Sequence, residues 1–260
     1  MMKIGLYDAG FGGISILNSL RKEFPDYEYR YLADTRNFPY YLKTRQQLDE
    51  LSLKNCEFLI DMGCDVVVIA CNTSTVVSLA YVRQKCPHKK IIGITPPLRR
   101  AAGLTKTGHI AVLSTPKTKN SAHVKMLIDQ YGSDLVIHNL SSENLSILVE
   151  AGKTTGPEIT KELRKDLESV RKDNKVDVLA LGCTHYPFAS TAMKEVIARD
   201  IQIIDSSADT IEQIHEMAKL NEENPRKDGS VQYFTSGNPA KLNQIAKRLF
   251  DEVSFTKIPD

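Results

Sequence analysis

Two well-separated stretches of this chain each consist of a short aliphatic run that ends in a cysteine. The first runs from Asp65 to Cys71, and the second runs from Asp177 to Cys183. Nearly continuous aliphatic runs bounded by polar residues are typical of strands that are buried on both faces of a parallel sheet. Because open α/β sheets bind ligands beyond the carboxyl ends of their strands, each cysteine is predicted at a ligand-binding edge.

Two thiols at such edges have more than one interpretation. If both face one pocket, they can serve as a pair of proton-transfer bases, one for each face of a carbon centre. Alternatively, they are small residues that fill the strand ends, since cysteine is among the most buried residue types. A cysteine hydrolase that pairs one thiol with His185 is also conceivable, but it leaves the second cysteine without a role. The matched contexts of Cys71 and Cys183 favour the pair of bases.

The rest of the chain alternates β-rich runs with segments of helical period, beginning with an expected strand at 3–8. Regular alternation predicts the α/β class, with mostly parallel sheets flanked by helices. Because the two strand-then-cysteine units look equivalent, two similar domains fit the pattern better than one. We expect the first domain at 1–95 together with 206–260, and the second at 96–205. The boundary is the Thr95-Pro96-Pro97 segment, since consecutive prolines break helices and strands.

The composition is that of an ordinary globular protein, in which 34 basic residues nearly balance 32 acidic ones. This balance does not indicate a nucleic-acid or membrane partner. The chain has no apolar stretch of the signal-peptide or membrane-spanning type, so we expect a cytoplasmic protein. Five cysteines without a Cys-x-x-Cys pair predict neither a disulfide framework nor a metal site. The polar stretch 221–229 is expected to be an exposed loop.

The first expected strand ends at Asp8 and is followed by a glycine-rich turn, Gly10-Phe11-Gly12-Gly13. Glycines let the backbone approach a ligand closely, and the start of the helix that follows favours an anion. The turn is not a dinucleotide fingerprint, because Ser15 occupies the position of its third glycine. A carboxylate at a strand end beside glycines is poorly solvated. Asp8 can therefore act as a base or orient another group.

Each strand-end cysteine is followed by polar residues at an expected helix start. These residues are Asn72, Thr73 and Thr184. Helix capping explains them as well as ligand binding does, and the two roles are compatible because both use the helix terminus. His185 stands two residues after Cys183. In a turn, its ring can stabilise the thiolate or relay its proton.

These motifs resemble those of the glutamate racemases, cofactor-independent enzymes of the aspartate/glutamate racemase superfamily. The similarity follows the chain in order and covers most of it. The matching segments are Asp8–Gly13, Ala33–Thr35 with Phe38–Tyr40, Cys71–Thr75, Thr115 with Thr118 and Ser121, Leu148–Glu150, Cys183–Pro187 and Asp205–Ala208. The two cysteine motifs are the most specific of these matches.

The resemblance implies two α/β domains that face each other with the active site in the cleft between them. It also implies racemisation by two thiols and no cofactor. By the family's roles, Cys71 deprotonates the D-enantiomer of the amino acid and Cys183 deprotonates the L-enantiomer. Asp8 and His185 assist the thiols, and Glu150 is a further candidate on the His185 side. A free thiol is only slightly ionised near neutral pH, so such assistance makes chemical sense.

The resemblance also implies which residues hold the substrate and what the enzyme is for. The residues that bind the amino acid would be Ala9, Pro39, Tyr40, Tyr41, Asn72, Thr73, Thr115, Thr118 and Thr184. Such an enzyme supplies D-glutamate for bacterial peptidoglycan and is expected to act as a homodimer.

Three residues of this chain depart from the family pattern. Ala9 stands where the family typically has a serine that contacts the substrate's charged end, and Tyr41 stands where it usually has a glycine. Pro96 replaces a commonly acidic position. These changes affect glutamate specificity more than racemisation itself. There are therefore two alternatives. The protein is a racemase of another amino acid such as aspartate, or it is a non-catalytic binding or regulatory protein of the same fold.

Overall fold

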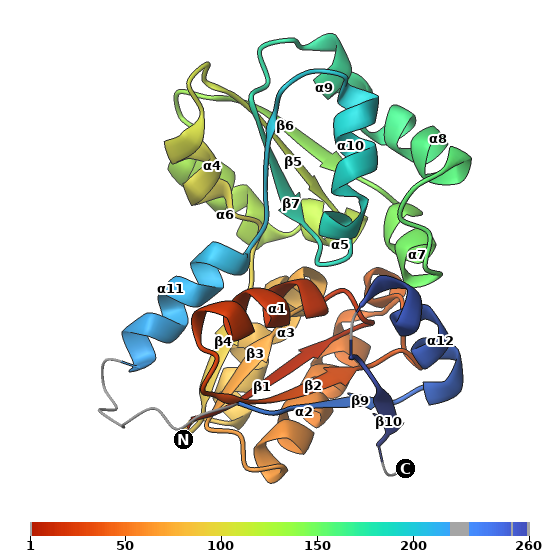
Figure 1. Cartoon of the computed structure of the whole chain (residues 1–260). Helices are drawn as coiled ribbons and strands as arrows, with labels where there is room; N and C mark the ends of the chain where they lie inside the picture. The colour runs from red at the N-terminus through yellow and green to blue at the C-terminus, as the bar shows by residue number, and fades with distance from the viewer. Residues whose placement is uncertain (1, 219–228, 251, 259–260) are drawn as a thin grey trace. The chain divides into compact units, whose positions relative to one another are not determined.

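The computed structural model describes residues 2–218, 229–250 and 252–258. The chain divides into two compact units: unit 1 comprises residues 1–94 and 207–260, and unit 2 comprises residues 95–206 (Figure 1). That these units are the two domains with the predicted bounds, 1–95 with 206–260 and 96–205, stays a prediction. Residues 221–228 of the polar stretch that we expected to be a loop lie outside the described residues.

Unit 1 contains a six-stranded, fully parallel sheet with the strand order β10-β9-β2-β1-β3-β4. Its strands are β1 (Lys3–Asp8), β2 (Glu28–Ala33), β3 (Val66–Ile69), β4 (Lys90–Gly93), β9 (Val231–Thr235) and β10 (Phe255–Lys257). Its helices are α1 (Ile14–Glu23), the short η1 (Tyr40–Leu42), α2 (Arg45–Asp61), α3 (Asn72–Lys85), α11 (Ser207–Ala218) and α12 (Pro239–Leu249). Helices α1 and α11 pack together on one face of this sheet, and α2 and α3 pack together on the other (Figure 1).

Unit 2 contains a four-stranded parallel sheet with the strand order β6-β5-β7-β8. Its strands are β5 (His109–Ser114), β6 (Val136–Ser141), β7 (Val178–Gly182) and β8 (Gln202–Ile204). Its helices are α4 (Leu98–Leu104), α5 (Pro116–Lys119), α6 (Ala122–Tyr131), α7 (Leu145–Glu150), α8 (Pro157–Asp166), α9 (Glu168–Lys172), η2 (Tyr186–Ala189) and α10 (Ser190–Ile197). Helix α4 packs with α6, and α8 packs with α10.

The predicted α/β class with parallel sheets flanked by helices is confirmed. The two units also share a strand order: β2-β1-β3-β4 in unit 1 matches β6-β5-β7-β8 in unit 2. Strands β3 and β7 occupy the same place in this order, and every residue of both is buried. The two strand-then-cysteine segments are therefore topologically equivalent, as the continuous aliphatic pattern indicated.

The structure also bears on membrane insertion. Among the helices within residues 2–218, 229–250 and 252–258, none combines the length and the apolar composition needed to cross a bilayer.

Candidate active site

In unit 1, Asp8 and Cys71 lie at the same edge of the sheet. Strands β1 and β3 are parallel neighbours with Tyr7 opposite Ile69, so the segments that follow the two strands leave the sheet side by side. Cys71 follows β3, is 7% exposed and occupies the N-cap position of α3. Asp8 is buried, and its two carboxylate oxygens accept hydrogen bonds of 2.8 Å from the backbone N–H groups of Ala9 and Gly13. The turn after β1 thus fixes the orientation of the Asp8 carboxylate.

Gly13 has a steric reason to be glycine. A Cβ atom at this position would lie 3.0 Å from Asp8 Cβ and 3.0 Å from the Tyr31 hydroxyl. That spacing is tighter than ordinary van der Waals contact, so a side chain would push the turn away from Asp8. The glycine-rich turn predicted from the sequence therefore brings the backbone close to a carboxylate of its own chain.

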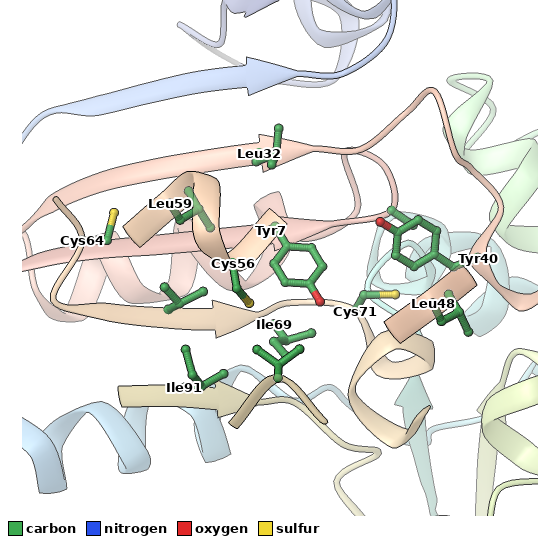
Figure 2. Close-up of a cluster of buried hydrophobic side chains, with 13 residues drawn as sticks. Tyr7, Leu32, Tyr40, Leu48, Cys56, Leu59, Cys64, Ile69, Cys71 and Ile91 are labelled. Atoms are coloured by element: carbon green, nitrogen blue, oxygen red, sulfur yellow. The ribbon is translucent and has the colours of Figure 1, made fainter. Parts of the chain in front are cut away.

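Two buried tyrosines lie near Cys71 in a cluster of buried side chains (Figure 2). The hydroxyl of Tyr7 is 2.6 Å from the hydroxyl of Ser74, which is in turn 2.6 Å from that of Ser52. Burial raises the pKa of Tyr7 and of Tyr40 well above the ordinary value for a phenol. Both side chains are therefore neutral near physiological pH.

Asn72, the residue after Cys71, has a buried amide group without a partner. Its side chain is 3% exposed, and within the described part of the chain neither Nδ2 nor Oδ1 has a hydrogen bond. Buried polar atoms are nearly always hydrogen-bonded, because an unpaired one costs about 1–3 kcal/mol. The amide offers a bound polar molecule two N–H donors on Nδ2 and an acceptor oxygen, Oδ1.

In unit 2, Cys183, His185 and Glu150 form a connected chain of side chains. The sulfur of Cys183 is 3.9 Å from Nδ1 of His185, and Nε2 of His185 is 2.7 Å from Oε2 of Glu150. Cys183 is 8% exposed and His185 is 2% exposed. The three residues come from the turn after β7 and from the last residue of α7. The structure thus joins the glutamate to the cysteine-and-histidine motif.

The charge of His185 follows from these contacts. Burial by itself lowers the pKa of His185, but hydrogen bonds with Cys183 and Glu150 and the negative charges of both groups together raise it well above its ordinary value. The ring is therefore a buried cation near neutral pH, and its partner Glu150 supplies the opposite charge. A cationic imidazole beside a thiol stabilises the thiolate.

Tyr186 is a site-building residue that sequence reasoning did not identify. Its buried hydroxyl donates to the carbonyl oxygens of Ser114 and Ser142 at 3.1 Å and 3.3 Å. These bonds fasten the turn that carries Cys183 and His185 to the ends of β5 and β6. Its position inside the cysteine motif could have indicated this role. The motif could not indicate the partners, because Ser114 and Ser142 are far away in the sequence.

Two predicted substrate-binding threonines lie at the end of β5, the strand next to β7. Thr115 is the N-cap of α5, and its hydroxyl donates to the hydroxyl of Thr118 at 3.0 Å. Ser114 pairs with Gly182, the residue before Cys183, so Thr115 leaves the sheet beside the thiol. Thr115 and Thr118 are both buried. Sequence reasoning and structure therefore place these residues at one edge of unit 2.

The remaining predicted residues divide between the same two edges. Ala9 and Thr73 are buried in unit 1, and Thr184 is buried in unit 2. Pro39, Tyr40 and Tyr41 belong to the segment at η1, which follows β2 in unit 1. Ala9, Thr73, Thr115 and Thr184 follow the carboxyl ends of β1, β3, β5 and β7.

Comparison with known proteins identifies the family. Residues 14–214 match the family model of the Asp/Glu/hydantoin racemases. The chain belongs to this family. The resemblance inferred from the sequence is thereby confirmed, and this member of the Asp/Glu/hydantoin racemases is an isomerase of the amino-acid racemase type.

Several members of the family are similar along their whole length. The glutamate racemase of Clostridium perfringens is 33% identical over 250 residues, which cover 95% of this chain and 96% of that protein. Among solved structures, a glutamate racemase of Bacillus anthracis matches with 25% identity and a TM-score of 0.85, covering 99% of this chain and 97% of the other. The glutamate racemase of Thermus thermophilus, solved with β-chloro-D-alanine, matches with 26% identity and a TM-score of 0.82, covering 99% and 96%.

Proposed function

We propose that this racemase interconverts L-glutamate and D-glutamate without a cofactor, through proton transfers by Cys71 and Cys183 on opposite faces of the α-carbon. One observation carries the proposal. Each thiol ends a topologically equivalent buried strand, Cys71 at the same sheet edge as the carboxylate of Asp8 and Cys183 beside the imidazole of His185. The full-length similarity to relatives named glutamate racemase supports the choice of substrate.

The proposed reaction is a pair of balanced proton transfers. One thiolate takes the α-proton, so that the carbon–hydrogen bond breaks, a sulfur–hydrogen bond forms and the electron pair stays on the substrate. The opposite thiol then gives its proton to the other face of the carbon. We assign Asp8 to the assistance of Cys71, and His185 with Glu150 to the assistance of Cys183. Because no cofactor would spread the carbanion's charge, fixed hydrogen bonds and exclusion of water must stabilise it.

Recognition of a zwitterion fits the unpartnered amide of Asn72. Its Oδ1 can accept from a substrate ammonium group, and its Nδ2 can donate to a carboxylate. We propose that Asn72 acts with the other residues at the two edges. These are Ala9, Pro39, Tyr40, Tyr41, Thr73, Thr115, Thr118 and Thr184. Since Ala9 and Tyr41 depart from the family pattern, aspartate is the alternative substrate.

The wider role is proposed from the family resemblance. The enzyme would act in the cytoplasm as a homodimer and supply D-glutamate for peptidoglycan.

Proton NMR in deuterated water tests the proposed function directly. Purified protein should remove the α-proton signal from both L-glutamate and D-glutamate and bring each to the racemic mixture. Cys71→Ser and Cys183→Ser should each abolish inversion, because two bases are needed. Cys86→Ser, which alters a thiol outside both edges, serves as the matched control and should keep full activity. Exchange with aspartate alone would select the alternative substrate, and no exchange with any amino acid would refute the racemisation.

A further inference from the structure

The proposed proton transfers do not use the carboxylate of Asp34, which is buried at the end of unit 1's β2. Four side chains surround it. The hydroxyls of Tyr40 and Ser236 are each 2.5 Å from one of its oxygens. The amide nitrogen of Asn37 lies 3.0 Å and 3.1 Å from the two oxygens, and that of Asn55 lies 3.4 Å from one of them. The connection after β2, helix α2 and the end of β9 thus converge on one buried carboxylate.

These contacts fix the direction in which the Tyr40 hydroxyl points. The Tyr40 hydroxyl donates its hydrogen to Oδ2 of Asp34. The Tyr40 oxygen in turn accepts a bond of 2.9 Å from the amide nitrogen of Asn55. Its side chain is 2% exposed and is held from two sides. Tyr40 therefore has a single, fixed orientation.

The Tyr40 ring lies next to Cys71. Both residues belong to one cluster of buried side chains, and Figure 2 shows the thiol beside the ring. Besides burial and the charge of Asp34, the charge of Cys71 also contributes to the raised pKa of Tyr40. The tyrosine is thus within electrostatic reach of both the buried carboxylate and the thiol.

We propose that Asp34 is a positioning residue for proton transfer at Cys71, because with Asn55 it holds the Tyr40 ring that fixes the place of the thiol. This inference rests on the proposed function. All members of the network belong to unit 1, whereas Cys183 is held by His185, Glu150 and Tyr186 of unit 2. Loss of the network therefore slows the transfer at Cys71 and not the transfer at Cys183.

Substrate isotope effects distinguish the two transfers. By the proposed roles, Cys71 breaks the α-carbon–hydrogen bond of D-glutamate, and Cys183 breaks that of L-glutamate. If proton transfer at Cys71 becomes slower, this transfer limits the overall rate of racemisation to a greater extent. The primary deuterium isotope effect on kcat/KM should then rise for D-glutamate deuterated at Cα and fall for L-glutamate deuterated at Cα. A general loss of structure would lower kcat/KM without moving the two isotope effects in opposite directions.

The test compares Tyr40→Phe and Asp34→Asn with the wild-type enzyme. Loss of one hydrogen bond to a charged group should reduce kcat/KM by about tenfold or more. The matched control is Tyr29→Phe, because the Tyr29 hydroxyl is also buried in unit 1 but bonds to the backbone oxygens of Leu20 and Phe24. The control should leave both isotope effects unchanged. Tyr40→Phe keeps the ring, so it gives a result even if Asp34→Asn does not fold.

The outcomes separate this inference from the proposed function. A wild-type enzyme that exchanges no α-proton would refute the function itself. A wild-type enzyme that racemises glutamate, together with variants whose two isotope effects stay constant or move in the same direction, would overturn the positioning role alone. The positioning role would be established if the isotope effect on kcat/KM rose for D-glutamate and fell for L-glutamate in Tyr40→Phe but not in Tyr29→Phe.

Discussion

The two cysteines differ in the ionisable group that accompanies them. Cys71 leaves the sheet beside Asp8, whose carboxylate is fixed by two backbone N–H groups. Cys183 lies beside the imidazole of His185, whose pKa is raised by hydrogen bonds with Cys183 and Glu150 against the effect of burial. Under the proposed function, the two directions of racemisation therefore start from thiols that are assisted by different groups. This difference leads to a prediction about the dependence of activity on pH.

Glu150→Gln should narrow the pH range of activity. Burial lowers the pKa of His185, whereas the hydrogen bonds with Cys183 and Glu150 and the charges of both groups raise it, so loss of the Glu150 charge should lower that pKa. If the protonated ring is required, the alkaline limb of kcat/KM then moves to lower pH. A lost charge-assisted bond of about 1.5–3 kcal/mol reduces kcat/KM by about 10- to 100-fold. Glu150→Asp, which keeps the charge, is the control, and an unmoved alkaline limb in Glu150→Gln would contradict the role of Glu150.

Gly182→Ala tests how tightly the end of β7 is packed. A Cβ atom at Gly182 would lie 2.8 Å from Ser114 Cβ and 2.9 Å from Pro96 Cγ, so one of these groups must shift. We expect a loss of about 1–3 kcal/mol in the free energy of unfolding. Since Cys183 is the next residue, kcat should fall as well. Urea unfolding and steady-state kinetics measure the two effects. The control is Gly103→Ala, because among the described residues no heavy atom beyond its chain neighbours and its own helix backbone lies within 4 Å of the added Cβ atom. This control should change neither the free energy of unfolding nor kcat by a comparable amount.

At the scale of elements, helix α3, which follows Cys71, begins without a side-chain cap. The Cys71 side chain stands at the N-cap of α3 but makes no capping hydrogen bond. By contrast, Thr44 caps α2 through a reciprocal pair of bonds with Gln47. A good N-cap contributes about 1 kcal/mol. Placing a thiol there gives up that stabilisation at the edge where we propose that substrate binds.

A second element-scale feature is a carboxylate that joins two neighbouring strands. Asp173 Oδ2 is 2.8 Å from His109 Nδ1 on β5 and 2.9 Å from His138 Nε2 on β6. Hydrogen bonds from His138, His109 and the backbone N–H of Lys175 hold the pKa of Asp173 well below its ordinary value. The ionised form of Asp173 therefore stabilises the folded state of unit 2.

Asp173→Asn should destabilise the protein in a way that depends on pH. The folded-state pKa of Asp173 is lowered, so its contribution is complete above the unfolded-state pKa of about 3.9 and is lost as the pH falls below it. The difference in urea midpoint between wild type and Asp173→Asn should be largest near neutral pH and shrink below about pH 4. The control is Asp129→Asn, an exposed carboxylate of α6. A difference that grows as the pH falls would contradict this assignment.

At the scale of the whole molecule, the proposed function requires one thiol from each unit. If both thiols serve one α-carbon, each lies about 3.5 Å from it and the sulfurs are about 7 Å apart. A bifunctional thiosulfonate reagent of that span should link Cys71 to Cys183 in peptide mass spectrometry, and saturating glutamate should suppress the link. Cys64 should stay unmodified, since it is 1% exposed and burial raises its pKa to about 11. Single labelling of both thiols without a link would contradict a shared substrate.

The sequence by itself determined the features that depend on patterns of burial and on motifs. Continuous aliphatic runs predicted β3 and β7. Because a cysteine follows each run, the sequence also predicted a thiol at the edge of each sheet. Strand β10 was missed, because a segment of three residues pairs with β9 at the sheet edge and has no period of its own. The order of the motifs indicated the family, which comparison confirmed.

Only the tertiary structure decided which side chains meet. Asp34 contacts Ser236 across 202 positions of the chain, and Tyr186 contacts Ser114 across 72. That the buried amide of Asn72 has no hydrogen-bond partner among the described residues likewise became visible only in the folded structure. The physical reason is that burial of a strand or helix imposes a repeating pattern on the sequence. A hydrogen bond between distant side chains depends on the folded path of the chain and leaves no local trace.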